Sequence, residues 1–225
     1  MPSSTFYLKD HTVTIDALGC QKDVAGTIVD SGGDYCLAEK DNQPALYDKI
    51  RALLDEGILE GFAGWKASSH QATNGGHGRI ETRTAWVTSE IEHLGELAKE
   101  WPGLAAIAVV ESRRTVLGKD AKPTQSRRYY ILSRVMPAAQ VQKIVRGHWG
   151  IENGLHYILD VSYGEDASRI RRRSATNYSR LRRLTLNMLK KETSVQDSIP
   201  GKRELCALSR DYRLKVIAAS LPYSA

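Results

Sequence analysis

Four polar side chains with a constant spacing lie in the stretch "HWGIENGLHYILD". His148, Glu152, His156 and Asp160 each follow the previous one by four residues. Residues four apart on one helix differ by only about 40° around its axis, so these side chains would form one polar stripe. Such a stripe could bind a metal ion, present a single catalytic carboxylate, or be the solvent-exposed edge of an amphipathic helix.

Helix geometry argues against a metal site built on the two histidines. Zinc hydrolases place two histidines four residues apart, whereas His148 and His156 are about 12 Å apart along a straight helix. One carboxylate of the ladder is more suitable for magnesium, because hard divalent cations prefer oxygen ligands. An apolar stripe beside the ladder is expected to pack on the core, and it consists of Ile151, Leu155, Ile158 and Leu159.

The first third of the chain must position any residues that act together with the ladder. Its predicted order of elements is β-α-β-α. "TVTIDALGC" predicts a short buried strand that ends near Asp16, and a helix follows over "CQKDVAGTIVDSGG". Residues 34–40 predict a second strand, parallel to the first because a helix joins them. Residues 41–57 predict a helix with Pro44 in its first turn and Gly57 as its stop.

The remainder is predicted to change from strands to helices. Residues 58–76 read as a loop, 78–89 as a strand, and "EIEHLGELAKEW" as a short helix. "LAAIAVVESRRTV" and "RRYYILSRV" predict two paired strands. From Pro137 the pattern is helical, over 138–160, roughly 174–192 and 203–220. We therefore divide the chain into a core segment 1–60, a β-rich insertion 61–136, a helical segment 137–192 completing the core, and a helical tail 193–225.

Composition is that of an ordinary globular protein. The chain has 225 residues, 41% hydrophobic and 26% charged, enough to bury a core. No apolar run is long enough to span a membrane, and the first residues do not resemble a signal peptide. Three widely spaced cysteines argue against a disulfide framework or a zinc ribbon. These features predict a cytoplasmic protein without a membrane partner.

The net charge of +6 is concentrated directly after the polar ladder. Nine basic residues and no acidic residue lie between Arg169 and Lys191. A basic cluster can follow a DNA backbone, and it can also be a solvated helix face. The predicted DNA-binding residues are Arg169, Arg171, Arg172, Arg173, Arg180, Arg182 and Arg183.

Three long segments resemble one family of mobile-element proteins. "TIDALGCQKDVAGTIVDSGGDYCLAEKDNQPALYD", "HGRIETR" and "HWGIENGLHYILDVSYGEDASRIRRRSATNYSRLRRLTLNMLKK" are similar to insertion-sequence transposases of the DDE type, in the ISAs group with the H-repeat-associated proteins. The resemblance follows the family order from about residue 12 to 218. It implies an α/β fold: a partial RNase H-like mixed sheet with inserted strands and a helical, basic C-terminal third.

The resemblance also implies a chemistry. In that family an Asp-Asp-Glu triad binds Mg²⁺ or Mn²⁺ for phosphodiester cleavage and strand transfer in DNA. The second Asp falls on Asp16 and the Glu on Glu152, which would be both catalytic residues and metal ligands. The partners would be the DNA of the element ends and further copies of the chain, and the place of action the bacterial nucleoid.

The match departs from the family pattern at its start. The first Asp of the triad belongs to an earlier segment resembling Asp-Gly-Lys-Thr-Leu-Arg, and nothing similar precedes Asp16. We therefore expect a truncated transposase that is inactive alone. The alternative is a non-catalytic, DNA-binding or self-associating remnant.

Further residues have supporting roles by resemblance. Related insertion sequences place a Tyr, an Arg and a Lys around the Glu, and these positions hold Val145, His148 and Leu159 here. Arg146, His148 and His156 are the candidates for those roles. His77 and Arg79 alternate with Glu81 and Arg83 in the "HGRIETR" match, which predicts a shared strand face and a place near the active site.

Overall fold

The computed structural model describes residues 7–76, 78–118 and 122–220, with the backbone alone at positions 152 and 153. The chain divides into two compact units, Met1–His148 and Trp149–Ala225. The boundary falls inside the helix α4 (Ala138–Ile151). We describe each unit by itself, and the four-segment division stays a prediction.

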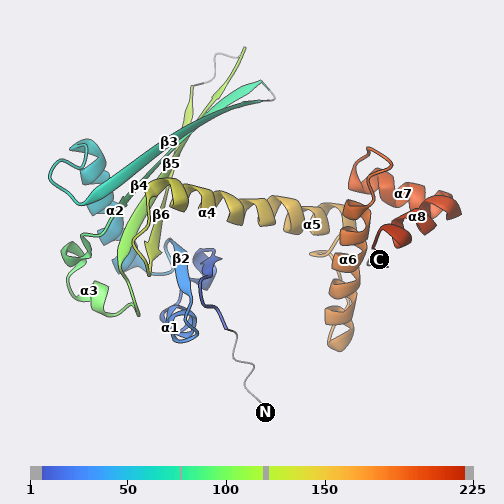
Figure 1. Cartoon of the computed structure of the whole chain (residues 1–225), viewed down its shortest axis with the longest axis horizontal. Coiled ribbons are helices and arrows are strands. Elements are labelled where there is room, and N and C mark those ends of the chain that lie inside the picture. Colours follow the sequence, from blue (N-terminus) through green and yellow to red (C-terminus); the bar gives the residue numbers. More distant parts are fainter. Residues whose placement is uncertain (1–6, 77, 119–121, 221–225) are drawn as a thin grey trace. The chain divides into compact units, whose positions relative to one another are not determined.

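The first unit is built on one mixed sheet of six strands in the order β1-β2-β6-β5-β4-β3 (Figure 1). β1 and β2 are parallel, as predicted, and every other neighbouring pair is antiparallel. β5 and β6 pair with each other, also as predicted. The strands are β1 (Thr12–Ile15), β2 (Asp34–Glu39), β3 (Ala67–Gly76), β4 (Arg79–Thr88), β5 (Ala106–Val116) and β6 (Thr124–Leu132).

Short connections hold the helices of this unit beside the sheet. α1 (Lys22–Asp30) makes the crossover between the two parallel strands, and α2 (Pro44–Leu59) follows β2. Pro44 lies in the first turn of α2 as predicted, where its missing N–H costs no hydrogen bond. The "EIEHLGELAKEW" segment forms two short turns, η2 (Ile91–Leu94) and α3 (Glu96–Lys99), because Gly95 between them adopts a φ of 63°.

Two predictions are wrong, one about the end of α2 and one about the segment that follows it. Gly57 does not end the helix: it is buried within α2, and the ring of Phe62 packs where a side chain would be. Residues 67–76 are not a loop but the edge strand β3, antiparallel to β4. β3 is exposed along nearly its whole length, so it needs no apolar alternation and shows none in the sequence.

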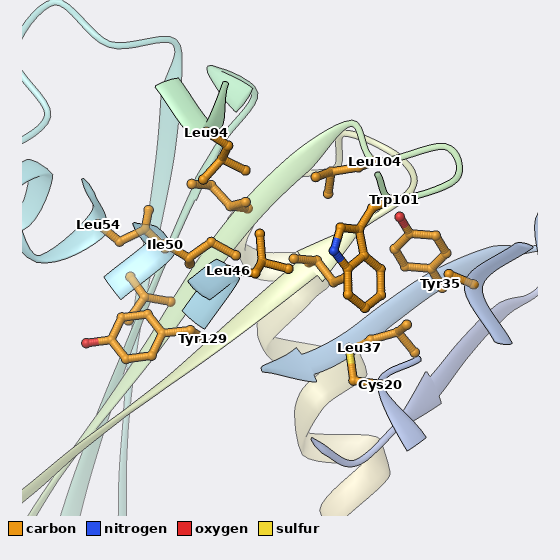
Figure 2. Packing of buried hydrophobic residues seen from close by; sticks show 14 of the residues in the cluster. Cys20, Tyr35, Leu37, Leu46, Ile50, Leu54, Leu94, Trp101, Leu104 and Tyr129 are labelled. Carbon is orange, nitrogen blue, oxygen red and sulfur yellow. The ribbon is translucent and has the colours of Figure 1, made fainter. Parts of the chain in front are cut away.

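One face of the sheet carries the main core. Side chains of β2, β5 and β6 pack there against α1 and α2, and Figure 2 shows Leu46, Ile50 and Leu54 of α2 in this cluster with Trp101 and Leu104. Tyr35 and Leu37 point into it from β2. β1 contributes less than predicted, because it is an edge strand and its four residues are only half-buried.

α4 covers the opposite face. Gln142 Nε2 donates to the carbonyl of Arg83 at 2.9 Å, and the N–H of Ala138 donates to Ser68 Oγ at 3.1 Å. Val141 and Val145 are buried there. The sheet therefore lies between helices, which is the mixed α/β architecture that the sequence predicts.

The second unit is helical, as predicted. A π-helical segment η3 (Glu152–His156) interrupts the predicted helix 138–160. The predicted helix 203–220 is two helices that break at Ser209. The helices of this unit are α5 (Tyr157–Tyr163), α6 (Arg173–Lys191), α7 (Ile199–Leu208) and α8 (Arg210–Ser220).

A small core and a buried ion pair stabilise these helices. Leu189 of α6 packs with Tyr212 and Val216 of α8. Glu192 lies 3.9 Å from Lys202 and accepts a hydrogen bond from the Tyr212 hydroxyl. None of the described helices is both long and apolar enough to cross a bilayer.

Candidate catalytic carboxylates and basic surfaces

Asp16 stands at the carboxyl end of β1, where the sequence placed it. It caps the short helix η1 (Ala17–Gly19), and its Oδ1 lies 3.4 Å from the N–H of Gly19. The residue is exposed, and it has no ion pair with any residue that the structure describes. The carboxyl ends of parallel strands are common positions for ligand-binding side chains. The carboxylate of Asp16 is therefore available to a ligand.

The turn after Asp16 is held by the segment that follows β2. Asn42 Nδ2 donates to the carbonyl of Cys20 at 3.1 Å, and Gln43 Nε2 reaches the same oxygen at 3.4 Å. The Cys20 thiol, itself buried, donates to Glu39 Oε1 at 2.7 Å. The side chains of Asn42, Gln43 and Glu39 thus hold Cys20, the residue at which the turn from Asp16 ends.

Glu39 is an unusual carboxyl group close to this turn. It is 4% exposed, and its Oε2 has no hydrogen-bond partner within the described parts of the chain. Burial raises the pKa of Glu39 to about 7, although the hydrogen bond from Cys20 lowers it in part. Burial also raises the pKa of the Cys20 thiol, so the thiol stays a protonated donor.

His148 is tied to β1 within the first unit. Its Nδ1 lies 3.1 Å from Thr14 Oγ1, two residues before Asp16, and the imidazole is half-buried. Either group could donate, depending on the tautomer of the ring. This hydrogen bond places the C-terminal end of the first unit beside the end of β1.

Glu152 begins the π-helical segment, so the polar ladder is not on one straight helix. A π turn contains an extra residue, and such turns are frequent at functional sites. The predicted apolar stripe is confirmed at Leu159, which is fully buried, and is wrong at Ile151, which is 55% exposed. Lys190 of α6 donates to the carbonyl of Gly154 in this segment at 2.6 Å.

The positions of the Tyr and Lys of related insertion sequences are structural in this chain. Val145 is 8% exposed and Leu159 is fully buried, so neither presents a group to a ligand. Arg146 and His156 are exposed and His148 is half-buried. The supporting roles of these three residues stay predictions.

The described residues contain no group of three or more His, Cys, Asp or Glu side chains arranged to hold a metal ion. Asp16 belongs to the first unit and Glu152 to the second. Their shared metal site is therefore a prediction. Asp16 suits the expected ion chemically, because it offers an exposed oxygen donor that no cation of the described chain already occupies.

The predicted DNA-binding arginines differ in their surroundings. Arg182 and Arg183 are partly buried and lie 3.9 and 3.4 Å from Glu165 Oε1. Arg172 precedes α6 with a φ of 63°, a region that residues other than glycine rarely adopt. Five are exposed at the start of α6, in its first half, or just before it: Arg169, Arg171, Arg172, Arg173 and Arg180. These five are exposed to solvent and could meet a phosphate backbone, although Arg171 Nη1 also donates to the carbonyl of Ser168 at 3.0 Å. Arg182 and Arg183 instead lie close to a carboxylate of the protein.

The "HGRIETR" residues lie mostly where the alternation predicts. His77 is outside the described residues. Arg79, Glu81 and Arg83 share one face of β4, since they pair with Val116, Arg114 and Ser112 of β5. Arg83 Nη2 lies 2.7 Å from Glu81.

Sequence reasoning missed two groups near Asp16. Thr14 and Glu39 look like ordinary alternating strand residues, and only burial and contact geometry distinguish them. The end of "DYCLAEK" on a carboxylate, with Asn42 and Gln43 beyond it, was the available signal for Glu39.

The first unit is a mixed α/β structure with an exposed carboxylate at a strand end, and comparison with known proteins specifies the family. Residues 3–188 match the transposase DDE domain. The chain belongs to this DDE transposase family.

Its relatives include proteins of enteric bacteria. It is 37% identical over 213 residues, 94% of the chain, to "Putative transposase YncI" of Escherichia coli O157:H7. It is 33% identical over 215 residues, 95% of the chain, to the H repeat-associated protein YhhI of Escherichia coli strain K12. These alignments cover 54% and 56% of the relatives, so the chain spans about half of their length.

Proposed function

We propose that this chain carries part of the catalytic centre of an insertion-sequence transposase. The reaction is divalent-metal-dependent phosphodiester cleavage and strand transfer in DNA transposition, carried out with the DNA in the cytoplasm. The observation that carries the proposal is the uncommitted carboxylate of Asp16 at the carboxyl end of β1, in a chain of the DDE transposase family.

Asp16 and Glu152 are the two metal ligands in this proposal, for Mg²⁺ or Mn²⁺. The metal would supply activation of a water or a DNA 3′-hydroxyl and stabilise charge on the attacked phosphate. The pairing of Asp16 with Glu152 rests on the family pattern. Within the first unit, the His148–Thr14 hydrogen bond would help to position Asp16, because Thr14 is two residues before it.

The parallel β1–β2 pair with its crossover helix would belong to an RNase H-like core. The first Asp of the triad has no counterpart before Asp16 in this sequence. Two carboxylates hold a divalent ion less firmly than three, so we expect no cleavage by the 225-residue polypeptide alone.

The exposed arginines between Arg169 and Arg180 would bind the phosphates of the element ends. No acidic residue lies between Arg169 and Arg180 in the sequence. This supports the role, since each neutralised phosphate adds a salt-dependent increment to affinity. We also propose that copies of the whole transposase associate with one another.

A second candidate function is a non-catalytic remnant that binds DNA or other copies of itself. Exposed apolar side chains on α6 favour it: Leu181 and Leu184 are 55% and 54% exposed. Such a remnant would bind DNA with or without a divalent metal.

Fe²⁺-dependent hydroxyl-radical cleavage of the polypeptide tests the metal site without requiring activity. Iron at the site should cut the backbone near both Asp16 and Glu152. Asp16→Asn and Glu152→Gln should each abolish both sets of cuts, whereas Asp10→Asn, a nearby exposed position, should abolish neither. Cuts near one residue only, or cuts unchanged in the variants, would refute a shared site.

The activity of the same polypeptide is measured with a plasmid that carries the element ends. No nicking is expected with Mg²⁺ or Mn²⁺. Metal-dependent nicking that disappears in Asp16→Asn would contradict the expected inactivity and would support the catalytic role.

A further inference from the structure

The strand register gathers basic residues on the face of the sheet that α4 covers. Directly paired residues of neighbouring strands share a face. Arg83 pairs with Ser112 and with Ala72, Glu81 pairs with Arg114, and Arg79 pairs with Val116. Arg79, Arg83 and Arg114 are therefore on one face, with Glu81 as the acidic residue between them.

Glu81 compensates only part of this charge. It contacts Arg83 at 2.7 Å and Arg114 at 3.8 Å, and Ser112 Oγ donates to it at 2.8 Å. Partial burial favours the neutral acid, but the hydrogen bond from Ser112 and the nearby guanidinium groups outweigh it and lower the pKa of Glu81. One carboxylate, fully ionised, therefore faces three arginines.

α4 adds two more cations to the same face. Lys143 and Arg146 are three residues apart, so they are neighbours on the helix surface. Both are exposed, and neither forms an ion pair with the part of the chain that the structure describes. Gln142, between the helix and the sheet, fixes their position through its hydrogen bond to the Arg83 carbonyl.

Lys143, Arg146 and Arg83 line a groove between α4 and the β3–β4 hairpin, and Arg114 lies on the same face of the sheet outside the groove lining. The volume of the groove is about 240 Å³, and its lining includes His70, Asn74, Arg83, Gln142, Lys143 and Arg146. In Figure 1 the β3–β4 hairpin projects away from the start of α4. The groove contains cations and neutral hydrogen-bonding groups but no large apolar side chain, as suits a phosphate backbone better than an apolar ligand.

The other face of the same strands is different. Arg127 lies 2.8 Å from both Asp55 and Glu111 there, so its charge is matched by protein carboxylates. Arg113 is exposed on that face, one residue from Arg114. The excess of positive charge is therefore a property of the α4 face and not of the strands in general.

We propose that the groove between α4 and the β3–β4 hairpin binds the phosphodiester backbone of DNA, as a surface separate from the Arg169–Arg180 cluster. Lys143, Arg146 and Arg114 contact phosphates, and Asn74 donates a hydrogen bond to the backbone. The choice of DNA rests on the proposed function, and the location rests on the register and the groove.

Fluorescence anisotropy with a short DNA duplex tests the surface, with EDTA present so that metal chemistry is absent. Lys143→Gln/Arg146→Gln should weaken binding roughly 10- to 100-fold near 0.1 M salt and lower the slope of log K against log salt by about 2, because each lost phosphate contact removes about 0.9. The matched control Lys49→Gln/Arg113→Gln removes the same charge from α2 and the opposite face, and it should change the slope little.

A second, single-residue comparison reduces the chance that misfolding explains the result. Arg114→Gln should weaken binding and lower the slope by about 1, whereas Arg113→Gln, its neighbour on the same strand, should not. Equal losses in both variants would overturn the proposal in favour of a net-charge effect, as would wild-type binding by Lys143→Gln/Arg146→Gln.

The result is distinguishable from the fate of the metal site. If iron cleavage fails at Asp16 and Glu152 but the charge variants lose DNA, the metal proposal is wrong and the groove stands. If iron cleavage succeeds but the charge variants bind normally, the groove is wrong and the metal proposal stands.

Discussion

Glu39 shows how a single buried carboxyl group can make the fold sensitive to pH. Its neighbours are the protonated thiol of Cys20 and apolar core residues of β2, and one of its oxygens lacks a partner in the described structure. A buried, incompletely paired carboxyl group favours its neutral form. The turn that carries Asp16 is therefore anchored to a group that titrates near neutral pH.

We predict that stability falls as the pH rises from about 4.5 to about 7, the ordinary and the raised pKa of Glu39. Below that window the carboxyl is protonated in both folded and unfolded chains. Within it the unfolded chain releases the proton first, so unfolding becomes easier, by up to about 3 kcal/mol. Glu39→Gln should remove this component, measured by urea unfolding at pH 5 and pH 8. A pH dependence identical to that of the wild type would contradict the raised pKa.

At the scale of elements, α2 and the loop after it depend on a close approach. A Cβ on Gly57 would lie 2.5 Å from Phe62 Cε1, and the N–H of Phe62 donates to the Gly57 carbonyl at 2.7 Å. The glycine that looked like a helix stop is required because an aromatic ring occupies its side-chain space. Its role belongs to packing and not to chain termination.

We predict that Gly57→Ala destabilises the protein although alanine is the better helix former. The gain in helix propensity is about 1 kcal/mol, and overpacking costs typically 1–3 kcal/mol, so the net loss should reach about 1 kcal/mol. Gly147→Ala is the control, since a Cβ on Gly147 of α4 would meet nothing within 4 Å, and it should stabilise by a few tenths to about 1 kcal/mol. Thermal unfolding compares the two; stabilisation in both variants would show that Phe62 moves aside at little cost.

The π-helical segment is the second case in which an element changes the meaning of a sequence pattern. A four-residue ladder implies one stripe only when the helical period is constant. Because η3 spans Glu152 to His156, the ladder does not follow the uniform α-helical period from which the sequence argument started. The sequence identified Glu152 by resemblance and not by that period.

On the scale of the whole molecule, two basic surfaces are proposed to bind DNA. One is the α4 face of the sheet in the first unit, and the other is the exposed arginine cluster at the start of α6 in the second. If both contact the same duplex, their contributions to the salt dependence should add.

We predict that Arg171→Gln/Arg173→Gln lowers the salt slope by about 2, and that combining it with Lys143→Gln/Arg146→Gln lowers it by about 4. Arg182→Gln is the internal comparison, because Arg182 is partly buried and close to Glu165, and it should change the slope less than an exposed arginine does. Anisotropy titrations at several salt concentrations measure these slopes. A combined effect no larger than either alone would mean that the duplex occupies only one surface at a time.

Much of the first third could be predicted from sequence because its signals are local. Pro44 starts α2, the β-α-β order requires a parallel pair, and Asp16 directly follows a run of β-branched residues. These features depend on backbone preferences and on the handedness of short connections, which a single sequence carries. The clustering of arginines after residue 168 is likewise a property of the chain itself.

Only the tertiary structure determined the features that depend on residues far apart in the chain. β3 is a strand because β4 pairs with it, and its exposed residues carry no apolar alternation. Glu39 has a raised pKa because it is buried in the folded first unit, beside Cys20 at the end of the turn from Asp16. Arg83 and Arg114 share a basic face because an antiparallel register aligns them, and no local pattern encodes a register between strands so distant in sequence. Burial and register are relations between segments, so they arise only when the sheet has formed.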